Sequence, residues 1–144
     1  MWRELIQKLE PAARFAPPVE PSAISAAGEA LGTRLPEELY AFLEESNGVR
    51  GKHGVSLVWP LERIVRDNLS FRRNPDFPRL YMPFDSLLFF ADAGDGDQFA
   101  FRILMSEVPD RDVYVWNHEN DSRSWCAPGL GTYLEWWLAG RIKS

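Results

Sequence analysis

Residues 87–101, LLFFADAGDGDQFAF, decide the fold class of this chain of 144 residues. The apolar run over 87–91 fits a central β-strand, and apolar and polar side chains alternate over 97–103 as they do in a half-buried strand. Where the two segments meet, residues 92–97 contain three aspartates and two glycines. Such a stretch can be a tight turn, a metal loop, a phosphate loop or a catalytic cluster, and the choice decides whether the sequence indicates an enzyme.

The Asp/Gly stretch fits none of the common ligand loops when each position is checked. An EF-hand needs oxygen ligands at loop positions 1, 3 and 5. A loop that starts at Asp92 has Gly94 at position 3, and one that starts at Asp95 has Phe99 at position 5. A dinucleotide loop fails because Phe99 replaces the third glycine and because a strand follows instead of a helix. A looser calcium or magnesium site built from Asp92, Asp95 and Asp97 stays open. The simplest interpretation is a tight turn in which the glycines adopt positive φ and the aspartates cap backbone amides.

Further elements are predicted on both sides of this hairpin. A strand over 113–118 follows it, and the short connections favour an antiparallel meander. Thr132 is expected to cap the closing helix, with Glu135 three residues later completing a capping box. The other predicted elements are helices over 2–9, from Ser22 as N-cap to Leu31, from Pro36 to Asn47-Gly48 and from Pro60 to about Leu69, a strand over 55–59, and irregular segments over 11–21 and 70–85.

This order of helices, strands and a final helix indicates an α+β fold. We expect a central, mostly antiparallel sheet flanked by helices. The length suits one domain over residues 1–144, and six Trp and nine Phe imply a substantial core.

The bulk charge and the apolar runs exclude several classes of function. A formal net charge of −5 argues against general nucleic-acid binding and is compatible with a basic protein partner. No apolar run approaches the length of a membrane helix, and the first residues lack a secretory core segment, so we expect no membrane contact and a cytoplasmic protein. The single cysteine, Cys126, cannot form an internal disulfide and is expected to be a small buried hydrophobe.

Catalytic and metal-binding motifs are weak in this sequence. His118-Glu119 begins like a zinc-protease motif, but Ser122 stands where the second histidine is required. With His53 and Cys126 added, there are still too few ligands for a His/Cys zinc site. A general-base role for His118 with an aspartate in a small hydrolase stays open, although a histidine at a strand end is more often structural. A nucleophilic Cys126–histidine pair lacks any supporting motif. We therefore predict no catalytic residue, no metal and no cofactor.

Several segments, in their order along the chain, resemble the SUKH superfamily. The branch they resemble contains fungal cell-wall (glucan) synthesis regulators and many bacterial homologues. The segments are ISAAGEALGTRLPEELYAFLEESNG (24–48), VWPLERI (58–64), LLFFADAGDGDQFAF (87–101), VYVWNHEND (113–121) and LGTYLEWWLAG (130–140). In the first of them the matching positions are Ile24, Glu29, Gly32, Leu35, Pro36, Leu39, Phe42, Leu43, Asn47 and Gly48.

The resemblance implies both a fold and a function. It implies an α+β fold, in agreement with the prediction above. It also implies a toxin-immunity protein: bacterial members bind and neutralise toxins from neighbouring or sister cells, often nucleases. No catalytic residues carry over. We therefore expect a protein that binds a cognate toxin and is a monomer or weak dimer. The alternatives are a regulatory adaptor, as in the fungal branch, and the small hydrolase using His118.

The partner-facing residues are predicted from charge alone. Residues 84–97 carry four aspartates and no Lys or Arg, and two further acidic residues follow the strand over 113–118. An acidic surface would speed association with a basic toxin, although the same residues could form no more than a solvated face. The predicted contacts are Asp85, Asp92, Asp95, Asp97, Glu119 and Asp121.

Overall fold

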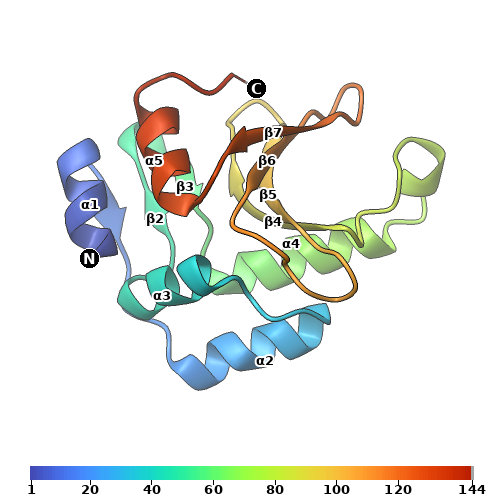
Figure 1. Ribbon diagram of the computed structural model, residues 1–144, viewed down its shortest axis with the longest axis horizontal. Coiled ribbons are helices and arrows are strands. Elements are labelled where there is room, and N and C mark those ends of the chain that lie inside the picture. Colours follow the sequence, from blue (N-terminus) through green and yellow to red (C-terminus); the bar gives the residue numbers. More distant parts are fainter. Residues whose placement is uncertain (144) are drawn as a thin grey trace.

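The computed structural model describes residues 1–143 and confirms an α+β fold (Figure 1). Its α-helices are α1 (Trp2–Leu9), α2 (Pro21–Leu31), α3 (Glu37–Glu45), α4 (Leu61–Arg73) and α5 (Leu130–Leu138). Its strands are β1 (Arg14–Phe15), β2 (Val49–Arg50), β3 (Ser56–Val58), β4 (Leu87–Asp92), β5 (Gln98–Arg102), β6 (Val113–Trp116) and β7 (Arg123–Ala127). Single 3₁₀ turns lie at Lys52–Gly54 and Phe77–Arg79.

The strands form two antiparallel sheets. The larger sheet has the order β4-β5-β6-β7, which confirms the predicted meander, and the smaller has the order β1-β2-β3. The sequence did not indicate β1, β2 or β7. β7 has no alternating pattern because its register shifts around Cys126: Val113 pairs with Ala127, whereas Tyr114 pairs with Trp125. Such a bulge breaks the two-residue period by which strands are recognised.

The prediction that β5 is half-buried was wrong at the centre of the strand, whereas Gln98 is only partly buried and Arg102 is exposed. Ala100 is as fully buried as Phe99 and Phe101, because helices cover both faces of the larger sheet (Figure 1). On one face Phe99 packs against Tyr133 of α5. On the other face an aromatic cluster fills the space between the sheet, α4 and the segment that follows α4. Its members are Phe71, Phe77, Tyr81, Phe84, Phe89 and Trp116.

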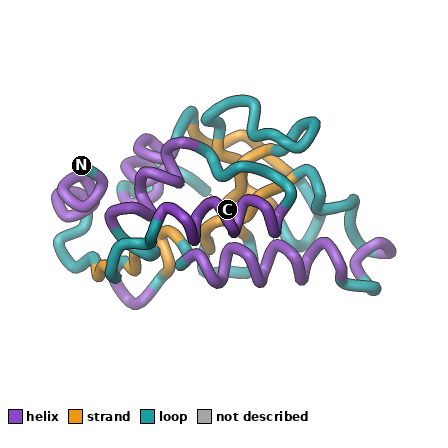
Figure 2. The backbone as a smooth tube through the Cα atoms, turned by 90° about the horizontal axis from the view of Figure 1, so that it is seen from below, coloured by secondary structure: helices purple, strands orange, loops and turns teal. Residues whose placement is uncertain are grey.

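The helices were predicted more accurately in their faces than in their ends. α2 packs against α4, and the two run side by side across the strands when viewed from below (Figure 2). α4 extends one turn beyond the predicted end, to Arg73. The reason is long-range: Arg72 donates hydrogen bonds to the carbonyls of Leu31 (2.8 Å) and Leu87 (3.3 Å). No helix among residues 1–143 is long and apolar enough to cross a membrane.

Two predicted helix caps were wrong. α2 begins at Pro21 with Glu20 as its N-cap residue, so Ser22 lies inside the first turn. α5 begins at Leu130, two residues before Thr132, so the capping box with Glu135 does not form. Instead, the Glu38 carboxylate of α3 accepts a hydrogen bond from the Leu130 N–H at 3.2 Å, 92 residues away in sequence. A carboxylate at a helix N-terminus also meets the positive end of the helix dipole.

Candidate functional site

The predicted site residues gather where two turns of the larger sheet meet. We call this region the turn face: it consists of residues 93–97, between β4 and β5, and residues 117–122, between β6 and β7. The first turn has the predicted form. Gly94 and Gly96 adopt φ of 92° and 103°, and Asp95 Oδ1 accepts a hydrogen bond from the Asp97 N–H at 3.0 Å. Among residues 1–143, no group of three His, Cys, Asp or Glu side chains is placed to hold a metal ion.

Asp97 joins the two turns. Its side chain is buried, and its Oδ1 accepts hydrogen bonds from the His118 N–H at 3.0 Å and from His118 Nδ1 at 2.6 Å. The imidazole lies against Gly96, where an added Cβ would come within 2.8 Å of the ring. The hydrogen bond with Asp97 raises the pKa of His118; partial desolvation opposes the rise, and the charges of Asp97, Glu119 and Asp95 reinforce it.

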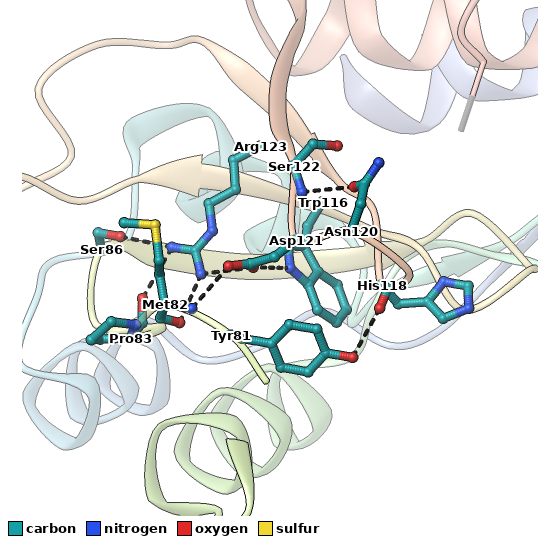
Figure 3. A network of polar contacts seen from close by, with 10 residues as sticks. All are labelled: Tyr81, Met82, Pro83, Ser86, Trp116, His118, Asn120, Asp121, Ser122 and Arg123. Atoms are coloured by element: carbon teal, nitrogen blue, oxygen red, sulfur yellow. Dashed lines mark hydrogen bonds and ion pairs between the residues drawn. The ribbon is translucent and has the colours of Figure 1, made fainter. Parts of the chain in front are cut away.

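Asp121 forms the second polar centre of the turn face (Figure 3). Its carboxylate accepts hydrogen bonds from the Met82 N–H (2.8 Å), Trp116 Nε1 (2.8 Å) and Arg123 Nη2 (3.1 Å). Burial raises the pKa of Asp121, but these hydrogen bonds and the Arg123 charge outweigh burial and hold the pKa below its ordinary value.

The segment 80–86 is fastened onto the turn face by the same network (Figure 3). Arg123 donates to the carbonyls of Met82 (2.9 Å) and Pro83 (3.0 Å), and the Tyr81 hydroxyl donates to the His118 carbonyl at 2.9 Å. Sequence reasoning treated this segment as irregular and did not identify Tyr81 or Arg123. The aromatic residues at 77, 81 and 84 were the available signal that the segment packs on the sheet.

The six predicted acidic contacts therefore have different surroundings. Asp97 and Asp121 use their carboxylates within the chain, and Asp92 forms an ion pair with Arg63 at 2.9 Å. Asp95 and Glu119 are exposed on the turn face. Asp85 is exposed just before β4 and lies near Arg72: burial lowers the Arg72 pKa, and the charge of Asp85 opposes this. The structure brings Asp95, Asp97 and Glu119 together around His118.

Cys126 lies half-buried on β7. Burial raises the pKa of its thiol to about 12. Because the thiolate is the nucleophilic form, a thiol with this pKa is unreactive at neutral pH. This is the behaviour of a small hydrophobe.

The pKa of His118 predicts a pH-dependent contribution to stability. A histidine whose pKa is raised on folding contributes stability that is complete below its unfolded pKa, about 6.5, and is lost as the pH rises through the folded pKa. We expect His118→Gln to destabilise the protein more at about pH 5.5 than at about pH 8.5. Urea unfolding of both proteins at the two pH values measures this. NMR titration of the His118 ring should give a midpoint above 6.5. An equal effect of the substitution at both pH values would contradict the pairing with Asp97.

A comparison with protein families identifies the family of this chain. The family model SUKH_6, described as SMI1-KNR4 cell-wall, matches residues 21–134. A search among curated proteins gave no significant match. The matched stretch begins at α2, includes both sheets apart from β1, and ends within α5, so it contains the whole turn face. Because the match covers well over half of the chain, the protein belongs to the SUKH superfamily, in its SMI1-KNR4 cell-wall family.

Proposed function

We propose that the protein is a non-enzymatic immunity protein that binds and neutralises a toxin delivered by a neighbouring or sister cell. The observation that carries the proposal is family membership over residues 21–134. The resemblance to the superfamily implies this role for its bacterial members. The net charge of −5 supports a basic partner such as a nuclease, because complementary potentials speed association. In this proposal the protein acts in the cytoplasm as a monomer or weak dimer.

The acidic residues predicted as contacts have two different roles in this proposal. Asp85, Asp95 and Glu119 are exposed and can meet a partner directly. Asp97 and Asp121 contribute indirectly, because their hydrogen bonds hold the two turns and the segment 80–86 in place. A surface ordered before binding loses less conformational entropy when a partner docks.

The proposal is tested by co-expressing the protein with the toxin encoded beside its gene. We expect cells to be protected from the toxin and the two purified proteins to form a tight one-to-one complex. A toxin inactivated in its active site serves as the control, because it should still bind although there is no toxicity to relieve. The absence of both protection and a complex would refute the immunity role.

The second candidate is a regulatory adaptor, and the description of the matched family as a cell-wall family favours it. An adaptor should capture several endogenous proteins reproducibly in a pull-down, without a toxin gene beside its own. An immunity protein should instead retain one dominant partner. The two functions therefore differ in the number of partners recovered.

The third candidate is a small hydrolase that uses His118 as a general base. The 2.6 Å contact with Asp97 favours it, because a buried carboxylate can orient and charge-stabilise an imidazole. Neither of the two cavities described below is lined by His118, which weighs against it. A hydrolase should lose its activity in His118→Ala, whereas an immunity protein with this substitution should still form its complex.

A further inference from the structure

A groove lies between α2 and α3, away from the turn face. It encloses about 990 Å³ and is closed at its sides by the start of α1, by the link between α2 and α3, and by the loop between β5 and β6. Its apolar lining comes from Trp2, Ile24 and Leu35, which are buried, and from Tyr40 and Ala41, which are half-buried. A volume of this size and an apolar lining with polar groups around it are typical of ligand sites.

Carboxylates outnumber guanidinium groups in the groove. Four glutamates and two arginines line it, so carboxylates are in excess. Glu38 is occupied by the N–H of Leu130. The side chains of Glu29, Glu37 and Glu44 are exposed and make no hydrogen bond or ion pair with any described residue. They differ in this from the aspartates of the turn face, most of which are paired internally.

One of the residues that line the groove, Trp2, carries an unsatisfied hydrogen-bond donor. Trp2 is 4% exposed, and its Nε1–H has no acceptor among residues 1–143. A buried donor without a partner is costly, because it has lost its hydrogen bonds to water.

An exposed apolar turn stands at one end of the groove. Leu104 and Met105 are 55% and 90% exposed at the tip of the loop between β5 and β6. Gly32, which lines the groove, also lines a neighbouring cavity of about 360 Å³ together with Leu104, Met105 and Ser106. In this turn Met105 and Ser106 both have positive φ (53° and 64°), although neither is a glycine. Exposed Met and Leu side chains of this kind adapt readily to a partner's surface.

We propose that this groove, together with Leu104 and Met105, is the docking surface for a basic protein segment that carries an apolar anchor. Lys or Arg side chains of the segment would pair with the free glutamates, and its anchor would fill the apolar lining. A nucleic acid is disfavoured because the excess carboxylates repel phosphates. The inference that the segment belongs to a toxin rests on the proposed function. The inference that it is basic and carries an apolar anchor rests on the groove alone.

The experiment uses two helical peptides as probes, one of lysine, leucine and alanine and one with glutamate in place of each lysine. Both are titrated into the isotope-labelled protein and followed by NMR. We expect the lysine peptide to bind and to shift the amide signals of α2, α3 and residues 104–107, and the glutamate peptide to bind at least about ten-fold more weakly. In the protein variant with Glu37→Lys and Glu44→Lys, affinity for the lysine peptide should fall at least about ten-fold.

The matched control carries Asp76→Lys and Glu135→Lys, which change the net charge equally at exposed positions outside both the groove and the turn face. We expect it to bind the lysine peptide like the unmodified protein. No binding, shifts outside the groove, or an equal loss in the control variant would each overturn the docking surface. A toxin that binds the groove variant as tightly as the unmodified protein would also overturn it while leaving the immunity role intact. Peptide binding at the groove without toxin protection would refute the immunity role alone.

Discussion

Asn68→Leu is expected to lower the free energy of unfolding by about 3–5 kcal/mol, because it removes the group that completes the edge of β4. Asn68 is 1% exposed on α4. Its Nδ2 donates to the Phe89 carbonyl at 2.9 Å, and its Oδ1 accepts from the Phe89 N–H at 2.8 Å. The amide side chain thus pairs with Phe89 as a neighbouring strand would. Leucine has a similar volume, so the substitution removes the hydrogen bonds with little change in packing.

The size of the effect follows from what is left behind. Phe89 is 1% exposed, so its N–H and its carbonyl would be buried without partners. Each such group costs about 1–3 kcal/mol. Urea unfolding monitored by tryptophan fluorescence measures the change, and Ser70→Ala, at an exposed position of the same helix, is the control. A loss of less than about 1 kcal/mol would show that water replaces the amide at this edge.

Local sequence patterns predicted those features that depend on neighbouring residues. The hairpin of β4 and β5 was predicted from an apolar run, a Gly/Asp turn and an alternating run, and its glycines have the expected positive φ. The buried face of α3 was predicted from helical spacing, and Leu39, Phe42 and Leu43 are fully buried. In both cases the residues that determine the structure lie close to one another in the sequence.

Features that depend on distant residues could not be predicted in this way. Asp95 and Asp97 lie two residues apart in the same turn, yet Asp95 is exposed and Asp97 is buried. The difference is made by His118, which is 21 residues from Asp97 in sequence. The cap that Glu38 provides for α5 is likewise a contact between distant segments. The sequence therefore identified a segment rich in acidic residues, but it could not predict which of these residues face solvent.

The two candidate contact surfaces differ in how their carboxylates are used. On the turn face the carboxylates of Asp97 and Asp121 accept several hydrogen bonds each, and these bonds give the turns a defined conformation. In the groove Glu37 and Glu44 have no hydrogen-bond or ion-pair partner among residues 1–143. A carboxylate that is already paired gains little from a partner's cation, because its existing contacts must be broken first. The free carboxylates of the groove are therefore better placed to attract a basic partner.

Gly48→Ala is expected to lower the free energy of unfolding by about 3–5 kcal/mol, because no side chain fits where the chain after α3 crosses the chain before α4. An added Cβ would lie 2.7 Å from the backbone nitrogen of Pro60 and 3.0 Å from the Trp59 carbonyl carbon. Both neighbours are backbone atoms, so they cannot rotate away. Gly48 also has φ of 84°, which alanine adopts only with strain. The preceding residue explains why the crossing is so close: Asn47 Oδ1 accepts a hydrogen bond from the Leu61 N–H at 2.7 Å and so caps α4.

Gly54→Ala separates the two sources of this cost. Gly54 has a similar φ of 76°, but nothing lies within 4 Å of its added Cβ. The free energy of unfolding of the Gly54→Ala variant should therefore fall only by the cost of the positive φ, about 1–2 kcal/mol. Thermal and urea unfolding of both variants measure the difference. Equal losses would mean that the Asn47-Gly48 pair is required only for its backbone conformation. A much larger loss at Gly48 would mean that the close crossing fixes the relative position of α3 and α4, and with it the α3 wall of the groove.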